Sequence, residues 1–208
     1  FNQYTLILLN YLNEKNFQNY LNIINEDEFG NPIYITYEGK KHSFSSLNSI
    51  IELDTINKNL NINNINNILE IGAGSGRTCS ALIKFKNNLK YTICDIPPAL
   101  FVAQSNLKKN FPNKKIFDFI IFNNYSEIKK DFENSDIKFL APNQIQHLPN
   151  KLYDLSIAID CLHEMQKNQV NNYFDEFDRL SSNIFFKCQN LQWADFEENK
   201  FSIDTYPT

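Results

Sequence analysis

The stretch LEIGAGSGR at residues 69–77 decides the fold of this chain. Three of the five glycines in the 208-residue sequence lie in it, at Gly72, Gly74 and Gly76. The apolar run Ile65–Ile71 before them predicts a buried strand, and the spacing of Arg77–Lys86 after them predicts a helix. Glycine permits a sharp turn and the close approach of a ligand to the backbone. The segment therefore predicts a strand, a ligand-binding loop and a helix in succession.

The spacing of the glycines argues against a dinucleotide. A G-x-G-x-x-G fingerprint needs a third glycine at position 77 or 79, where the chain has Arg77 and Cys79. The sequence also lacks the G-x-x-x-x-G-K-[ST] pattern of a P-loop. Glu70 at the strand end would repel a pyrophosphate and attract a cofactor that carries an ammonium and a sulfonium. S-adenosylmethionine carries both, although Glu70 could also be a surface carboxylate or a helix-dipole partner.

The rest of the chain alternates between short apolar runs and helical patterns. This alternation predicts an α/β fold with a doubly wound, mostly parallel sheet and helices on both faces. The continuous apolarity of Leu152–Ile159 predicts a strand buried on both sides. The remaining expected strands are Tyr91–Cys94, Phe117–Phe122, Ile137–Leu140 and Ile184–Lys187, and the expected helices are Pro98–Lys109, Glu127–Phe132 and Val170–Leu180.

Residues 1–63 predict an N-terminal helical extension or lid on this α/β domain of residues 64–208. Helical spacing covers residues 4–26 and Ser46–Lys58, and Ile33–Tyr37 could be a short strand. About twenty residues follow Lys187, and only Phe201–Ile203 among them resembles a strand. We therefore expect a sheet that is truncated at its C-terminal edge or completed by another chain.

An acidic residue follows the next strand as well. Asp95 comes about 20 residues after the glycine loop, the spacing at which a carboxylate can accept hydrogen bonds from ribose hydroxyls. It could also cap the helix that Pro97 and Pro98 open. The two roles are compatible, and the spacing favours the ribose.

At this point the sequence resembles a known group. Residues 69–77 together with CDIPPAL at 94–100 resemble class I S-adenosylmethionine-dependent methyltransferases, which have a Rossmann-like fold. The segments FLAPNQ at 139–144, DCLHEM at 160–165 and FFK at 185–187 are similar to the sugar O-methyltransferases of bacterial surface-polysaccharide pathways. The resemblance spans residues 64–190 and implies methyl transfer to a sugar hydroxyl. The cofactor contacts that it implies are Glu70, Gly72, Ala73, Gly74, Arg77, Asp95, Ile96, Asn143 and Gln144.

Two of these contacts would serve the adenine. Asn143 and Gln144 follow the third core strand, and a side-chain amide can both donate to and accept from the edge of an adenine ring. The alternative is that they belong to an ordinary polar loop, and the sequence leaves both interpretations open.

Asp160, His163 and Glu164 end the fourth core strand and are the candidate catalytic residues. All three could bind a divalent metal, but we assign no metal site, because the cluster also suits a general base. His163 is the first candidate, since its ordinary pKa lies near neutral pH, and Asp160 is the second. His42 and His147 lie in polar segments and receive no role.

Composition narrows the remaining classes. The net charge of −4 without a lysine and arginine patch argues against nucleic acid, and no apolar run approaches the length of a membrane span. Four cysteines without CxxC spacing predict reduced core residues and a cytoplasmic protein. The acceptor is expected to be a small molecule or sugar, and an oligomer stays open. The alternative functions are an NAD-dependent oxidoreductase on the same sheet and a methyltransferase-like domain that binds without catalysis.

Overall fold

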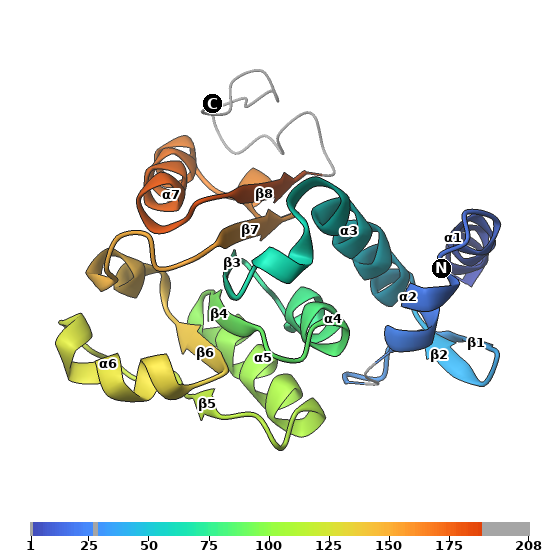
Figure 1. The fold of residues 1–208 in the computed structure, drawn as a ribbon, viewed down its shortest axis with the longest axis horizontal. Coiled ribbons are helices and arrows are strands. Elements are labelled where there is room, and N and C mark those ends of the chain that lie inside the picture. Colours follow the sequence, from blue (N-terminus) through green and yellow to red (C-terminus); the bar gives the residue numbers. More distant parts are fainter. Residues whose placement is uncertain (1, 27–28, 189–208) are drawn as a thin grey trace.

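A six-stranded sheet forms the centre of the structure, a computed structural model that describes residues 2–26 and 29–188 (Figure 1). Every neighbouring pair of strands in this sheet is parallel. The central strands are buried along most of their length, and β7 is buried at all five positions. The strands are β3 (Asn67–Ile71), β4 (Lys90–Cys94), β5 (Ile116–Phe117), β6 (Ile137–Leu140), β7 (Leu155–Ile159) and β8 (Ile184–Lys187).

Helices cover both faces of this sheet, as the alternating pattern predicts. One core cluster packs α3 (Phe44–Leu60), α4 (Arg77–Phe85) and α5 (Pro97–Asn110) against Ile68, Tyr91 and Phe139. The other packs α6 (Tyr125–Asn134) and α7 (Lys167–Leu180) against Leu69 and Leu140. The doubly wound fold class is confirmed by these two layers.

The strand order fixes where a ligand can bind. The strands of the sheet stand in the order β5-β6-β4-β3-β7-β8. Starting from β3, the chain first adds β4, β5 and β6 on one side, and then crosses back to add β7 and β8 on the other side. Counted along the chain, the five longer strands stand in the order 3-2-1-4-5, which is the doubly wound arrangement. Ligands of such sheets bind at the carboxyl ends of the strands, beside the point of reversal. Here that point lies between β3 and β7.

The N-terminal part differs from the sequence prediction. The single helix expected over residues 4–26 is wrong, because α1 (Asn2–Glu14) ends before α2 (Gln18–Ile23) begins. Asn16 between them has a left-handed backbone with φ of 62°, a conformation that breaks a helix and that asparagine tolerates well.

A hairpin joins this part to α3. Its strands are β1 (Ile35–Tyr37) and β2 (Lys40–His42), which pair antiparallel. Glu38 and Gly39 both have positive φ, as a two-residue hairpin turn requires. The sequence analysis missed β2 and placed His42 in a polar loop, whereas the side chain is buried at the end of the strand.

Three expected strands are shorter than the apolar runs that predicted them. The one expected over Ile65–Ile71 begins at Asn67. The strand expected over Phe117–Phe122 ends at Phe117, where the chain leaves the sheet edge, and the Phe119 N–H donates to Gln104 Oε1 of α5 at 3.2 Å. The one expected over Leu152–Ile159 begins at Leu155. Short 3₁₀ helices complete the connections at Ile62–Asn64, Pro142–His147 and Leu162–Glu164.

The C-terminal edge remains a prediction. The last described strand is β8, and Phe201–Ile203 lies outside the described residues. Cys79, Cys94 and Cys161 are buried and Cys188 is half-buried. Within residues 2–26 and 29–188, none of the helices is long and apolar enough to cross a bilayer.

Asp154 ties the start of the central strand to its neighbour, and its loss should be measurable. Its Oδ2 accepts the backbone N–H groups of Asn66 at 2.7 Å and Asn67 at 3.0 Å. Because the acceptor is charged, Asp154→Ala should lower the free energy of unfolding by about 1.5–3 kcal/mol in a denaturant titration. Asp175→Ala, at an exposed position of α7, is the matched control and should change it by less than about 0.5 kcal/mol. Equal effects of the two changes would contradict this role.

Candidate functional site

The glycine loop lies at the carboxyl end of β3, beside the reversal point. All three loop glycines have positive φ, 72° at Gly72, 57° at Gly74 and 81° at Gly76. A Cβ on Gly72 would lie 2.4 Å from the Cβ of Cys161, so the loops after β3 and β7 pass at a distance that only glycine allows. A Cβ on Gly74 would meet no atom within 4 Å. The backbone at Gly74 therefore borders open space into which a ligand can fit.

Asp95 lies at the end of β4 and is hydrogen-bonded to this loop. Its Oδ2 accepts the Gly74 N–H at 2.9 Å, and its Oδ1 accepts the Ile96 N–H at 2.7 Å. The helix-capping alternative does not describe this arrangement, because Ile96 is the N-cap residue of α5 and Asp95 precedes it. The Ile96 side chain is 58% exposed at the same edge. A carboxylate and an apolar side chain thus flank the open side of the loop.

Glu70 is buried beneath the loop, with 2% of its surface exposed. The alternation of side chains along β3 directs Glu70 to the α3 and α4 side of the sheet, where the Tyr91 hydroxyl donates to its Oε2 at 2.9 Å. Thr78 of α4 provides a second hydrogen bond. Burial raises the pKa of Glu70 to about 7, because desolvation penalises the charged form more than these bonds stabilise it. The carboxyl group therefore changes charge near neutral pH.

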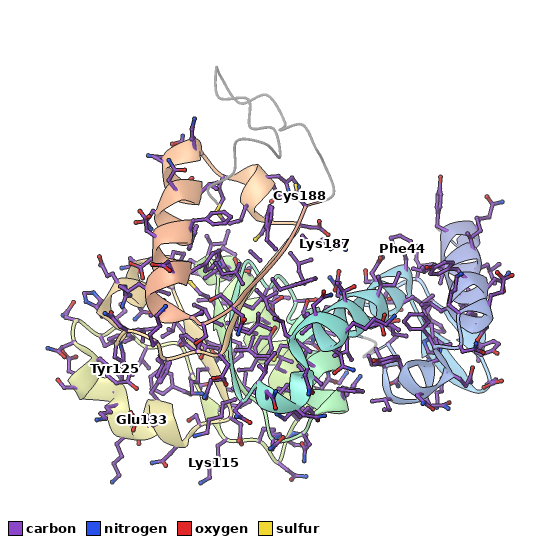
Figure 2. All side chains as sticks on the ribbon, turned by 45° about the horizontal axis from the view of Figure 1, so that its top comes forward. Phe44, Lys115, Tyr125, Glu133, Lys187 and Cys188 are labelled. Atoms are coloured by element: carbon purple, nitrogen blue, oxygen red, sulfur yellow. The ribbon has the colours of Figure 1, made fainter. Side chains whose placement is uncertain are left out.

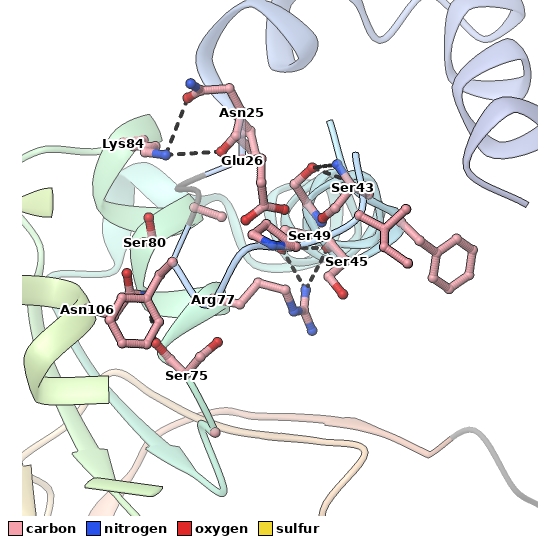
Figure 3. A pocket seen from close by; sticks show the side chains of 18 of the residues that line it. Asn25, Glu26, Ser43, Ser45, Ser49, Ser75, Arg77, Ser80, Lys84 and Asn106 are labelled. Atoms are coloured by element: carbon pink, nitrogen blue, oxygen red, sulfur yellow. Dashed lines mark hydrogen bonds between the residues drawn. The ribbon is translucent and has the colours of Figure 1, made fainter. Parts of the chain in front are cut away.

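Arg77, the first residue of α4, reaches toward α3 (Figure 3). Its Nη1 donates to Glu52 Oε2 at 2.7 Å, to Ser49 Oγ at 2.6 Å and to the Ser45 carbonyl at 3.3 Å. These acceptors follow helical spacing and form one face of α3. In the structure Arg77 thus links the glycine loop to the N-terminal part of the chain.

The two adenine candidates differ in their surroundings. Gln144 is buried, and its side chain accepts from the Ala141 N–H at 2.8 Å and donates to the Ile120 carbonyl at 2.7 Å. Both ends of its amide therefore hold backbone segments together. Asn143 next to it is exposed at the carboxyl edge.

The catalytic candidates gather after β7, across the reversal point from the glycine loop. Asp160 has a left-handed backbone with φ of 51°, which is uncommon outside glycine. His163 lies on the following 3₁₀ turn with its side chain 14% exposed, 3.9 Å from the carboxylate of Glu164, which is 76% exposed. The structure thus brings the three residues to one loop, with His163 the more sheltered of the last two.

Two charged residues join this group that the sequence analysis did not single out. Lys187 Nζ at the end of β8, labelled in Figure 2, lies 3.5 Å from Asp160 Oδ2 and 2.7 Å from Glu52 Oε1. Glu52 is 2% exposed on α3. Lys187 carried a signal in the sequence, because it is the last residue of the FFK segment. Glu52 carried none, because a single glutamate in a helix cannot be told from an exposed carboxylate.

A cavity of about 510 Å³ borders the glycine loop on the side of α3 and α4. Figure 3 shows hydroxyl and amide side chains around it, from Ser45 and Ser49 of α3 to Ser75 and Asn106. The cavity adjoins Ala73 and Gly74, but neither Asp95 nor Asp160 lines it. It therefore extends from the loop toward the N-terminal part, and the candidate base His163 does not line it.

Sequence comparisons add no family. No protein-family model matches the chain, and no curated protein matches it in sequence.

Solved structures similar to this chain include methyltransferases. The SAH-bound methyltransferase of Podospora anserina has a TM-score of 0.47 and 17% identity over 72% of this chain and 54% of its own. A Staphylococcus aureus protein assigned as a caffeoyl-CoA O-methyltransferase has a TM-score of 0.43 and 20% identity over 64% of this chain and 53% of its own. The chain thus spans little more than half the length of these two proteins. At such values the likeness carries no argument about function, which rests on the residues themselves.

The buried carboxyl group of Glu70 makes stability depend on pH. Between the ordinary pKa of glutamate and about 7, the unfolded chain releases this proton while the folded chain keeps it, so stability falls as pH rises through this window. The total loss is about 3–4 kcal/mol, because the pKa rises from 4.5 to about 7 and each tenfold change in proton affinity corresponds to about 1.4 kcal/mol. Glu70→Gln removes the titration and still accepts from Tyr91. Relative to the wild type, it should gain stability between pH 5 and pH 8 in denaturant titrations, and parallel pH profiles would refute the raised pKa.

Proposed function

We propose that this chain binds S-adenosylmethionine at the carboxyl ends of β3 and β4 and transfers its methyl group to a hydroxyl of a sugar or sugar-linked metabolite. The observation that carries the proposal is the open backbone at Gly74, hydrogen-bonded to Asp95 at the reversal point of a doubly wound sheet. The acceptor class rests on the resemblance of residues 139–144, 160–165 and 185–187 to sugar O-methyltransferases.

The residues present fit this cofactor. A nucleoside needs a carboxylate for its ribose hydroxyls, and Asp95 at the loop meets that need. Ile96 offers an exposed apolar surface for the adenine ring, and Asn143 an amide for its edge. Gln144 contributes by fixing this segment, since both ends of its amide are bonded to backbone. Glu70 beneath the loop supplies negative charge toward a cationic ligand once it loses its proton.

The same observations argue against NAD. A pyrophosphate would lie over a loop with Glu70 beneath it, and this carboxylate repels an anion once it is ionised. No third glycine stands at position 77 or 79. A non-catalytic binding domain would need no residue that can move a proton beside the loop. His163 and Asp160 are two such residues, and they favour an enzyme.

The chemistry left to the protein is the removal of one proton. Bound S-adenosylmethionine supplies a methyl group on a positively charged sulfur, which needs no acid to leave. An acceptor hydroxyl is a poor nucleophile while it keeps its proton, and a positioned base accelerates the attack. His163 is the candidate base, held by the 3₁₀ turn after β7, and Asp160 is the second candidate. No metal is assigned to this step, and the described residues contain no cluster of three metal-ligating side chains.

Cofactor binding provides the first test. Isothermal titration calorimetry should detect S-adenosylmethionine and S-adenosylhomocysteine but not NAD. Asp95→Ala should weaken both by about 10–150-fold, because a charge-assisted hydrogen bond contributes about 1.5–3 kcal/mol. Asp118→Ala is the control, since this carboxylate is half exposed in an ion pair with Lys108, and it should leave both affinities unchanged. Binding of NAD without S-adenosylmethionine would overturn the assignment.

The base can be tested once an acceptor is found in a panel of nucleotide-activated sugars. His163→Ala should lower kcat by about 10²–10⁴-fold, while the affinity for S-adenosylmethionine stays within about twofold, since the proton is removed from the acceptor. Near-normal turnover of the variant would make His163 structural and direct attention to Asp160.

A further inference from the structure

The carboxyl edge of the sheet carries a buried charge cluster centred on Glu52. One of its oxygens accepts from Arg77 at 2.7 Å and the other from Lys187 at 2.7 Å. Lys187 in turn lies 3.5 Å from Asp160. A single glutamate of α3 thus joins the residue after the glycine loop, the end of β8 and, through Lys187, the end of β7.

The charges of this cluster are sheltered from solvent to different degrees. Glu52 is 2% exposed, whereas the side chains of Arg77, Lys187 and Asp160 are 27%, 31% and 20% exposed. Salt screens a buried charge far less than an exposed one. The most deeply buried member is therefore Glu52, which together with Asp160 balances the two cations at the edge where the cofactor is proposed to bind.

We propose that Glu52 is a specificity-determining residue that makes this edge favour S-adenosylmethionine over S-adenosylhomocysteine. The inference rests on the proposed function. The two ligands share the nucleoside and the amino acid, but the first carries a positive sulfonium where the second has a neutral thioether. With Glu52 in place beside Asp160, the charges of Arg77 and Lys187 are balanced and do not repel the sulfonium. An edge without net positive charge binds S-adenosylmethionine and releases S-adenosylhomocysteine, which has no charge on its sulfur.

The sign of the effect follows from Coulomb's law. Removing the Glu52 charge leaves a net positive charge near the sulfonium and none that acts on the thioether. At a protein-like dielectric and a separation of about 10 Å, one charge changes an ionic affinity by about tenfold. Removing the Lys187 charge has the opposite sign. A residue that only supports the fold would change both affinities in parallel.

The experiment measures the ratio of the dissociation constants for S-adenosylmethionine and S-adenosylhomocysteine by calorimetry in the full chain. Glu52→Gln should raise this ratio about tenfold, and Lys187→Met should lower it by about threefold or more. The double variant, which loses one anion and one cation, should return close to the wild-type ratio. Asp54→Asn, on the same helix in an ion pair with the exposed Lys58, is the matched control and should leave the ratio unchanged.

Each outcome decides the matter. If Glu52→Gln fails to fold, Lys187→Met and the charge-balanced double variant still give the sign. Ratios that stay constant, or that move in the same direction in both single variants, would overturn the role of Glu52. If the wild type binds neither ligand, the proposed function itself fails. That result differs from one in which all variants bind both ligands with the same ratio of dissociation constants, which overturns only the role of Glu52.

Discussion

Gly72 and Cys161 are in close contact at the reversal point of the sheet, between β3 and β7, and the contact leaves no room for a side chain on Gly72. The Cys161 thiol donates to the carbonyl of Ile71 at 3.1 Å in the same place. This close approach holds the loop after β3 against the loop after β7. The proposed cofactor loop and the candidate base are brought together by it, although they are far apart in the sequence.

Charge is the second constraint at this edge. An ionisable side chain that is buried against a sheet covered on both faces needs a partner or has a shifted pKa. Glu70 has a pKa raised to about 7. Arg77 and Lys187 instead have a partner, because both donate hydrogen bonds to Glu52. The N-terminal part of the chain thereby supplies a charge that the α/β part lacks.

Much of the fold could be predicted from the sequence because its signals are local. The apolar runs of β6 and β8 match the structure residue by residue, and Pro97 and Pro98 open α5 as expected. The errors have physical causes that a single segment does not reveal. The strand expected over Phe117–Phe122 lies at the sheet edge, and there the side chain of Gln104 in α5 accepts a backbone N–H of this segment. The helix expected over residues 4–26 is broken at Asn16, which has a left-handed backbone.

The candidate site could be predicted where its residues belong to one sequence motif. It could not be predicted where a side chain is bonded to residues from a distant segment. Gly72, Gly74 and Asp95 could be chosen from spacing alone. That Arg77 faces α3 depends on Ser45, Ser49 and Glu52, which only the folded chain aligns with it.

The acceptor face of α3 has a consequence for recombining such domains. Ser45, Ser49 and Glu52 occupy successive turns of one helix, and their cations come from α4 and β8. A chimera that takes residues 1–63 from a protein without this face would leave Arg77 without the carboxylate of Glu52 and Lys187 with Asp160 alone. A recombined domain would therefore have to carry Ser45, Ser49 and Glu52 together with Arg77 and Lys187.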